Sequence, residues 1–134
     1  MRIAPLALAA LAFAGALPAA AQSPAAFLDA FAREARQADS AFAASAARGR
    51  AFYAATHGRE WSCASCHTGE PAASGRHAAT GKPIAPFAPS ANPERFTSAG
   101  KVEKWFRRNC NDVAGRACTA GEKADILAWL LAAK

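Results

Sequence analysis

Apolar residues recur every three or four positions in four stretches of the chain, which is the spacing of an amphipathic helix. These stretches cover about residues 24–38, 40–55, 98–108 and 120–131. Ser23 and Pro24 supply an N-cap and a first-turn proline for the first stretch. Thr119 and Glu122 have capping-box spacing before the last. No stretch alternates apolar and polar residues for long enough to predict a strand. The pattern therefore predicts an all-α fold.

The second and fourth predicted helices are expected to cross. Gly49 lies four residues before Tyr53, on the same helical face. Because a glycine inside a helix costs about 1 kcal/mol relative to alanine, its presence indicates a close approach by another helix. The C-terminal helix, with Ile126, Leu127 and Leu130, is apolar over much of its circumference. It therefore has the character of a helix packed on more than one side.

The chain begins with the pattern of a secretory signal peptide. An apolar run from Ile3 to Leu17 follows Arg2, and residues 19–21 provide an A-x-A cleavage site. Because the run is shorter than the ~18 apolar residues of a membrane span, no stable membrane insertion is expected after cleavage. Residues 1–21 are predicted to be removed, leaving residues 22–134 as one small exported domain.

The most informative motif lies in an irregular segment, residues 57–95, that is rich in glycine and proline. Cys63-Ala64-Ser65-Cys66-His67 is the signature of covalent c-type haem attachment. The two sulfurs can form thioethers to the haem vinyl groups from one short turn, and the histidine follows as the proximal iron ligand. A zinc site would need two further ligands at a recognisable spacing, and a redox CxxC pair would need a βαβ setting. The sequence offers neither, so the predicted cofactor is one covalent haem c.

Two further cysteines, Cys110 and Cys118, stand outside the motif. In an exported protein the simplest interpretation is a disulfide between them, with two free thiols as the alternative. Such a disulfide closes a short loop and would contribute about 2–3 kcal/mol to stability.

The charge of the chain is basic but dispersed. It carries 16 Lys and Arg against 10 Asp and Glu, a formal net charge of +6, which loses one unit when Arg2 leaves with the signal. The basic residues are scattered rather than interleaved with aromatic residues, so no nucleic-acid partner is expected. A docking face for an acidic redox partner and a simply solvated surface both fit this distribution.

The motif leaves open which group binds the iron opposite the proximal histidine. Electron-transfer cytochromes c of this size use a methionine, and the single methionine, Met1, belongs to the predicted signal. The remaining candidates are His57, His77, a lysine, Asn109 or no side chain. Both histidines stand so close to the attachment turn that a surface position is favoured for each.

Asn109 ends the otherwise apolar stripe of Val102, Trp105 and Phe106 on the third predicted helix. A buried asparagine must find hydrogen-bond partners or destabilise the fold. A disulfide at Cys110 would fix the backbone beside it, at the predicted end of the helix. Because asparagine also favours helix termini, the pattern supports an iron ligand and a helix-end residue equally.

Several short segments in the second half of the chain carry a family resemblance. They are Thr80-Gly81-Lys82, Ile84-Ala85-Pro86, Ala88-Pro89-Ser90, Arg95-Phe96-Thr97, Val102-Glu103-Lys104-Trp105, Arg108-Asn109-Cys110, Gly115-Arg116 and Gly121-Glu122-Lys123-Ala124-Asp125. Together with the haem-attachment motif they resemble the SHP (sphaeroides haem protein) family of class I cytochromes c. The similarity runs nearly without gaps from Thr80 to about Leu131, whereas residues 22–47 resemble the family only loosely.

The resemblance implies a small class I cytochrome c fold wrapped around one covalent haem. Cys63 and Cys66 would carry the thioethers, His67 would be the proximal iron ligand, and Asn109 would be the distal ligand in the oxidised state. The Cys110–Cys118 disulfide would lie directly beside that distal ligand.

The resemblance also implies a function. On reduction the asparagine is expected to leave the iron and open a site for oxygen or nitric oxide, near which Trp105 could donate a hydrogen bond. The implied protein transfers one electron, binds diatomic gases and could oxidise nitric oxide. Its redox partner would be another c-type cytochrome or a membrane cytochrome. The alternative is a plain periplasmic electron carrier whose haem stays six-coordinate.

Overall fold

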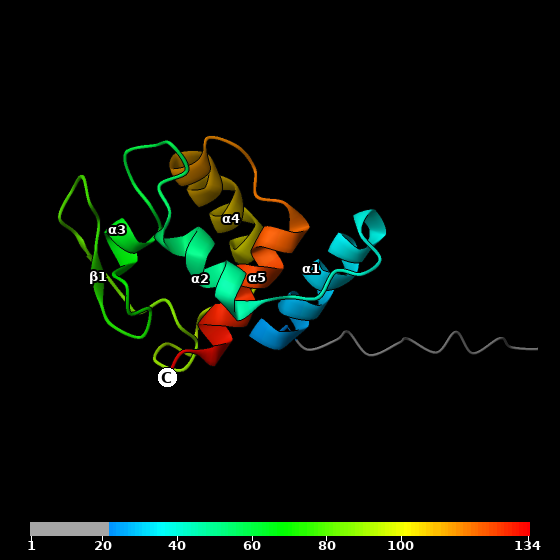
Figure 1. Ribbon diagram of the computed structural model, residues 1–134. Coiled ribbons are helices and arrows are strands. Elements are labelled where there is room, and N and C mark those ends of the chain that lie inside the picture. Colours follow the sequence, from blue (N-terminus) through cyan, green and yellow to red (C-terminus); the bar gives the residue numbers. More distant parts are fainter. Residues whose placement is uncertain (1–21) are drawn as a thin grey trace, which may run out of the picture.

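The computed structural model describes residues 22–134; the predicted signal segment lies outside the described residues. In chain order the elements are α1 (Pro24–Ala38), α2 (Ala46–Ala54), α3 (Ala64–His67), β1 (Gly75–Arg76), β2 (Pro83–Ile84), α4 (Ala99–Ala114) and α5 (Ala120–Ala132). Figure 1 shows α2 crossing α5 at the centre, with α1 on one side and α3 with β1 on the other. Within the described part of the chain, no helix combines the length and apolarity that a membrane crossing requires.

The expected all-α fold is confirmed, with one small addition. The irregular segment between α2 and α4 contains a two-stranded antiparallel ribbon in which Gly75 pairs with Ile84. The strands are two residues long, too short for any alternation of apolar and polar residues to reveal them. The ribbon packs closely against α3. A Cβ on any larger residue at position 75 would overlap the Cys66 carbonyl oxygen.

The caps predicted for the first and last helices are present. The Ser23 Oγ accepts a hydrogen bond from the Ala26 N–H at the start of α1. Thr119 and Glu122 form both hydrogen bonds of a capping box at the start of α5. The second helix was expected from residue 40, but α2 begins at Ala46. The carboxylate of Asp39 accepts a hydrogen bond from the Ala41 N–H, and this local turn replaces helical hydrogen bonds there.

The expected crossing of α2 and α5 is confirmed. Gly49 is buried, and a Cβ at this position would overlap the backbone carbonyl of Asp125 on α5. The carboxylate of Asp125 accepts hydrogen bonds from the Ser45 N–H at 2.7 Å and from the Arg48 Nε at 2.7 Å. These bonds fix the start of α2 against α5, so the glycine permits the contact and the carboxylate holds it.

The third predicted helix continues further than the sequence indicated. It was expected to end near Arg108, but α4 runs to Ala114. Gly115 ends it in the left-handed region, with φ of 70°, and donates its N–H to the Asn111 carbonyl. Gly115 therefore ends the helix, because a glycine adopts this conformation without steric cost.

One core joins α1, α4 and α5. Its buried members are Phe31, Ala32, Val102, Phe106, Cys110, Cys118, Ala124, Ile126, Leu127 and Leu130. The rings of Phe31 and Phe106 meet edge to face, with centroids 5.6 Å apart. This contact joins α4 to α1 through side chains.

Candidate haem site

The CxxCH motif forms a one-turn helix. Cys63 precedes α3, whose last residue is His67, and the His67 N–H donates to the Cys63 carbonyl at 3.0 Å. The spacing of three between Cys63 and Cys66 places both side chains on one side of this turn. Both thiols are free and half-buried.

The proximal histidine is held by an aromatic ring from the irregular segment. The imidazole of His67 lies almost parallel to the ring of Phe87, with centroids 4.5 Å apart. Burial, together with the nearby Arg95 cation, lowers the pKa of His67 to about 4. The imidazole is therefore neutral at physiological pH, the form in which histidine binds a metal.

The donor set of the attachment turn fits a haem. Among the described residues, only two buried side-chain polar atoms have no hydrogen-bond partner, His67 Nδ1 and Tyr53 Oη. Residues 22–134 contain no group of three His, Cys, Asp or Glu side chains that could hold an ion, which a structural zinc site would need. A pair of free thiols and one neutral imidazole on a single turn match the donor set of a covalently attached haem.

A chain of aromatic contacts links the motif to α4. Phe87, beside the proximal histidine, contacts Phe96 at 5.6 Å, and Phe96 contacts Phe106 at 6.5 Å between centroids. No sequence signal marks Phe87 or Arg95 as part of the site, because neither belongs to a motif with a fixed spacing. Their contacts with the motif arise only from the folding of the irregular segment.

Asn109 lies in α4, five residues before its end. This corrects the interpretation of Asn109 as a helix-end residue, because the left-handed Gly115 provides the stop. Asn109 is half-buried, between the buried Phe106 and Cys110 and the exposed flank of the helix. Cys110 forms a disulfide with Cys118, with 5.6 Å between their Cα atoms. The backbone that carries Asn109 is therefore tied to the segment leading into α5.

The remaining candidates, Trp105, His57 and His77, lie in three different environments. Trp105 is 45% exposed, and the Lys104 and Arg108 cations lie over its ring. His57 was expected to be solvated, but it is half-buried, and its Nε2 lies 2.8 Å from the Phe52 carbonyl oxygen. His77 is partly exposed in the turn between β1 and β2, where its Nδ1 accepts a hydrogen bond from the Thr80 N–H.

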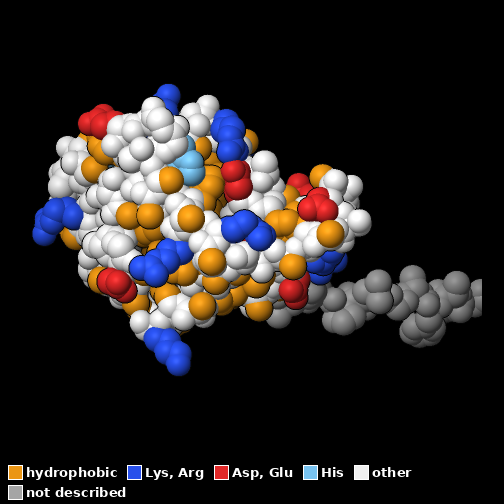
Figure 2. Space-filling model, viewed as in Figure 1, with side chains coloured by type: hydrophobic (Ala, Val, Ile, Leu, Met, Phe, Trp, Pro, Cys, Tyr) orange, Lys and Arg blue, Asp and Glu red, His pale blue; other side chains and the backbone are white. Residues whose placement is uncertain are grey.

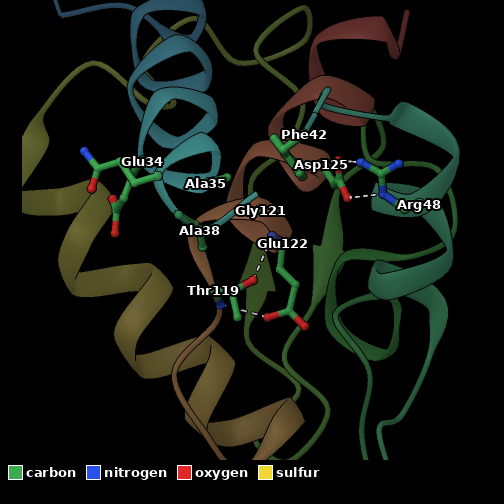
Figure 3. Close-up of a pocket in the computed structure, with 11 residues that line it drawn as sticks. Glu34, Ala35, Ala38, Phe42, Arg48, Thr119, Gly121, Glu122 and Asp125 are labelled. Carbon is green, nitrogen blue, oxygen red and sulfur yellow. Dashed lines mark hydrogen bonds and ion pairs between the residues drawn. The ribbon is translucent and has the colours of Figure 1, made fainter. Parts of the chain in front are cut away.

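The charge is dispersed over one face of the molecule, and a groove lies away from the attachment motif. In Figure 2 the Lys and Arg side chains on the visible face are separated from one another. A groove of about 740 Å³ lies where α1 meets the start of α5 (Figure 3). Several of its polar side chains are already hydrogen-bonded: Arg48 donates to Asp125, and the Glu122 carboxylate accepts from the Thr119 N–H. It is remote in sequence from the CxxCH motif and supplies none of the predicted haem ligands.

Comparison with known proteins identifies the family. The family described as a domain of unknown function, DUF1924, matches residues 39–130. The chain is 54% identical to cytochrome c-type protein SHP of Cereibacter sphaeroides over 93 residues, which are 66% of this chain and 71% of that protein. The structure of oxidised SHP, an oxygen-binding cytochrome c, matches with a TM-score of 0.74 and 47% identity, over 83% of this chain and 97% of that one.

A second relative is cytochrome c'' of Methylophilus methylotrophus. Its solution structure, a study of haem-ligand detachment, matches with a TM-score of 0.70 and 38% identity, over 81% of this chain and 91% of that one. The sequence match spans about half, 51%, of that protein. The chain belongs to the SHP family of c-type cytochromes and carries covalently bound haem c.

Proposed function

We propose that this monohaem cytochrome transfers one electron and opens a gas-binding position at its iron on reduction. The observation that carries the proposal is the placement of Asn109 beside the disulfide-bonded Cys110 in a chain whose one methionine is Met1. Two relatives support it, since SHP is an oxygen-binding cytochrome c and cytochrome c'' has been studied for haem-ligand detachment.

The attachment residues would hold the haem on one side. The Cys63 and Cys66 thiols would add across the two vinyl groups to form thioethers, and His67 would bind the iron through Nε2 while keeping its proton on Nδ1. When bound, the haem supplies an iron that accepts one electron and a coordination position that a diatomic gas can occupy.

On the other side, Asn109 would occupy the distal position in the oxidised state. An amide oxygen is a neutral, weak ligand that suits ferric better than ferrous iron, so the side chain is expected to leave on reduction. Because the disulfide ties down the C-terminal part of α4, the movement is expected to be a rotation of the Asn109 side chain rather than a shift of the helix. Val102 and Phe106 would line the vacated position, and Trp105 would be a nearby donor.

We further propose a reaction at the open iron and a cellular location for the protein. Nitric oxide, oxygen and one electron from the redox partner balance to give nitrate, which would make a nitric oxide dioxygenase-like reaction available at the open position. Removal of residues 1–21 would leave residues 22–134 as the mature domain in the periplasm. A second c-type cytochrome or a membrane cytochrome would supply the electron.

The distal ligand is tested with two matched variants of the haem-loaded protein. Asn109→Ala is expected to change the ferric absorption spectrum while the covalent haem survives, because the CxxCH motif is intact. His77→Ala is expected to leave the spectrum unchanged. The reverse result would favour the plain electron carrier, with His77 as a permanent ligand, and would remove Asn109 from the iron.

A further inference from the structure

Gln22, the first residue of the predicted mature chain, binds the start of α4. Its side-chain oxygen Oε1 accepts a hydrogen bond of 2.9 Å from the Ala99 N–H, although the two residues are 77 positions apart in the chain. Ala99 is the first residue of α4, and Ser98, at the N-cap position, makes no side-chain capping bond. Gln22 therefore supplies the side-chain cap that Ser98 does not make.

The same residue stands beside a second helix start. Gln22 directly precedes Ser23, the N-cap of α1, whose Oγ accepts a hydrogen bond from the Ala26 N–H at 3.1 Å. The N-terminus of each helix carries a positive charge equivalent to roughly half an elementary charge. Removal of residues 1–21 would convert the backbone nitrogen of Gln22 into an α-amino group, which is largely cationic at neutral pH. Both helix ends would repel that cation and favour the neutral amine.

We propose that Gln22, once it is the N-terminal residue, cyclises to pyroglutamate on the folded protein. The neutral α-amine attacks the side-chain carbonyl carbon, Cδ, and the bond between Cδ and Nε2 breaks. One amine proton passes to the leaving nitrogen, so the products are a lactam and ammonia and no co-reactant is needed. The Ala99 N–H already donates to the oxygen on which negative charge develops during the attack. The start of α4 therefore assists the reaction in the manner of an oxyanion hole.

The product suits both helices better than the free terminus does. The lactam is neutral, so the repulsion from the two helix ends disappears, and its carbonyl oxygen can still accept from the Ala99 N–H. The lactam also lacks the free amine that aminopeptidases require, which protects the Ser23 cap of α1. The cyclised residue ties down the start of α4, as the Cys110–Cys118 disulfide ties down its C-terminal part.

The inference rests on the proposed removal of residues 1–21 and is independent of the distal iron ligand. It is tested by mass spectrometry of the intact, exported, haem-loaded protein. The expected chain begins at residue 22 and is lighter by one ammonia than its sequence requires. Gln22→Asn is the matched control, because it keeps the amide on a side chain too short for this lactam, and it is expected to keep its ammonia. A chain that begins elsewhere would overturn the proposed cleavage, whereas Gln22 at full mass would overturn the cyclisation alone.

Two variants at Ala99 test the part played by α4. Ala99→Pro removes the N–H that donates to Gln22, and proline is well tolerated at the first position of a helix. Ser98 already has the extended backbone, with φ of −139° and ψ of 120°, that a following proline requires. Ala99→Gly keeps the N–H and is the control for the loss of the alanine side chain.

The rate is measured by releasing Gln22 from a cleavable leader with a site-specific protease and following the loss of ammonia by mass spectrometry. Ala99→Pro is expected to cyclise about tenfold more slowly than wild type, less than the loss of an enclosed oxyanion-hole donor costs, because this bond is exposed. Ala99→Gly is expected to match the wild type. Equal rates in the two variants would overturn the assistance from α4.

Discussion

The imidazole of His67 and the ring of Phe87 lie 4.5 Å apart and within 22° of parallel. Phe87 comes from a segment with almost no regular structure, yet its backbone is fixed, because the Phe87 and Ala88 N–H groups both donate to the Pro71 carbonyl. Two hydrogen bonds to one carbonyl thus hold the ring that orients the proximal histidine. An irregular segment can therefore position a side chain at a site when hydrogen bonds fix its backbone near the motif that the side chain contacts.

Phe87→Ala is expected to loosen the proximal side. It removes the ring contact with His67 and should lower the free energy of unfolding by about 2–3 kcal/mol, since Phe87 is half-buried. Phe27→Ala removes a ring that packs on the core at α1 and serves as the control. Urea unfolding and the iron–histidine stretching band of the reduced protein check the two variants. An unchanged band in Phe87→Ala would contradict the orienting role of this ring.

Gly49→Ala is expected to separate α2 from α5. The added methyl group would overlap the Asp125 carbonyl, and overpacking of this kind typically costs about 1–3 kcal/mol. Gly100→Ala is the matched control, because a Cβ at that helical position meets open space. That substitution should stabilise the protein by about 0.5–1 kcal/mol. Urea unfolding of both variants checks the prediction, and equal effects would show that the crossing is not tight at Gly49.

The sequence predicted the fold correctly where a local signal, such as a helix cap, coincided with the pattern of core residues. Ser23 and the Thr119–Glu122 capping box marked helix starts correctly, and Gly49 indicated a crossing that the structure contains. The predicted start of α2 and the predicted end of α4 were wrong. The alanine-rich composition of residues 40–45 predicts helix, whereas Asp39 and Ser45 form local hydrogen bonds that replace helical ones before α2.

Removing the disulfide with Cys110→Ser and Cys118→Ser together is expected to cost about 2–3 kcal/mol, because the unfolded chain gains loop entropy. The same change frees the C-terminal part of α4, where Asn109 lies. Urea unfolding should show the loss of stability, and stopped-flow reduction in the presence of carbon monoxide should show faster exchange of Asn109 for the gas. Unaltered stability and exchange in the double variant would contradict the anchoring role of the disulfide.

The site was only partly accessible from the sequence. Cys63, Cys66 and His67 lie close together in the chain, so their spacing alone identified the haem-attachment motif. Tyr53 and Arg95 reach Phe87 from distant segments, and only the folded structure shows that a buried hydroxyl without a hydrogen-bond partner and a guanidinium both contact that ring. No spacing rule encodes such a meeting, because it depends on the path of the irregular segment.

Acid is expected to weaken the start of α5. The Arg116 hydrogen bonds lower the pKa of Glu122, and the Thr119 N–H assists. A lowered folded-state pKa means that the carboxylate stabilises the fold at pH values above its ordinary pKa, 4.5, and that this stability is lost as the pH falls through the lowered value. Glu122→Gln should therefore reduce the loss of stability on acidification.

The check is the urea midpoint across this pH range, with Glu70→Gln as the control on an exposed carboxylate. Glu70→Gln is expected to keep the wild-type pH profile. A Glu122→Gln profile that coincides with the wild type would contradict the contribution of the capping box to acid stability.

The central claim is that reduction opens the iron to a gas while Asn109 withdraws. The most direct measurement is anaerobic reduction of the holoprotein followed by titration with carbon monoxide, monitored by the absorption spectrum. A high-spin ferric form that becomes five-coordinate on reduction and takes up carbon monoxide is the predicted result. A low-spin ferrous spectrum that does not respond to carbon monoxide would contradict the account.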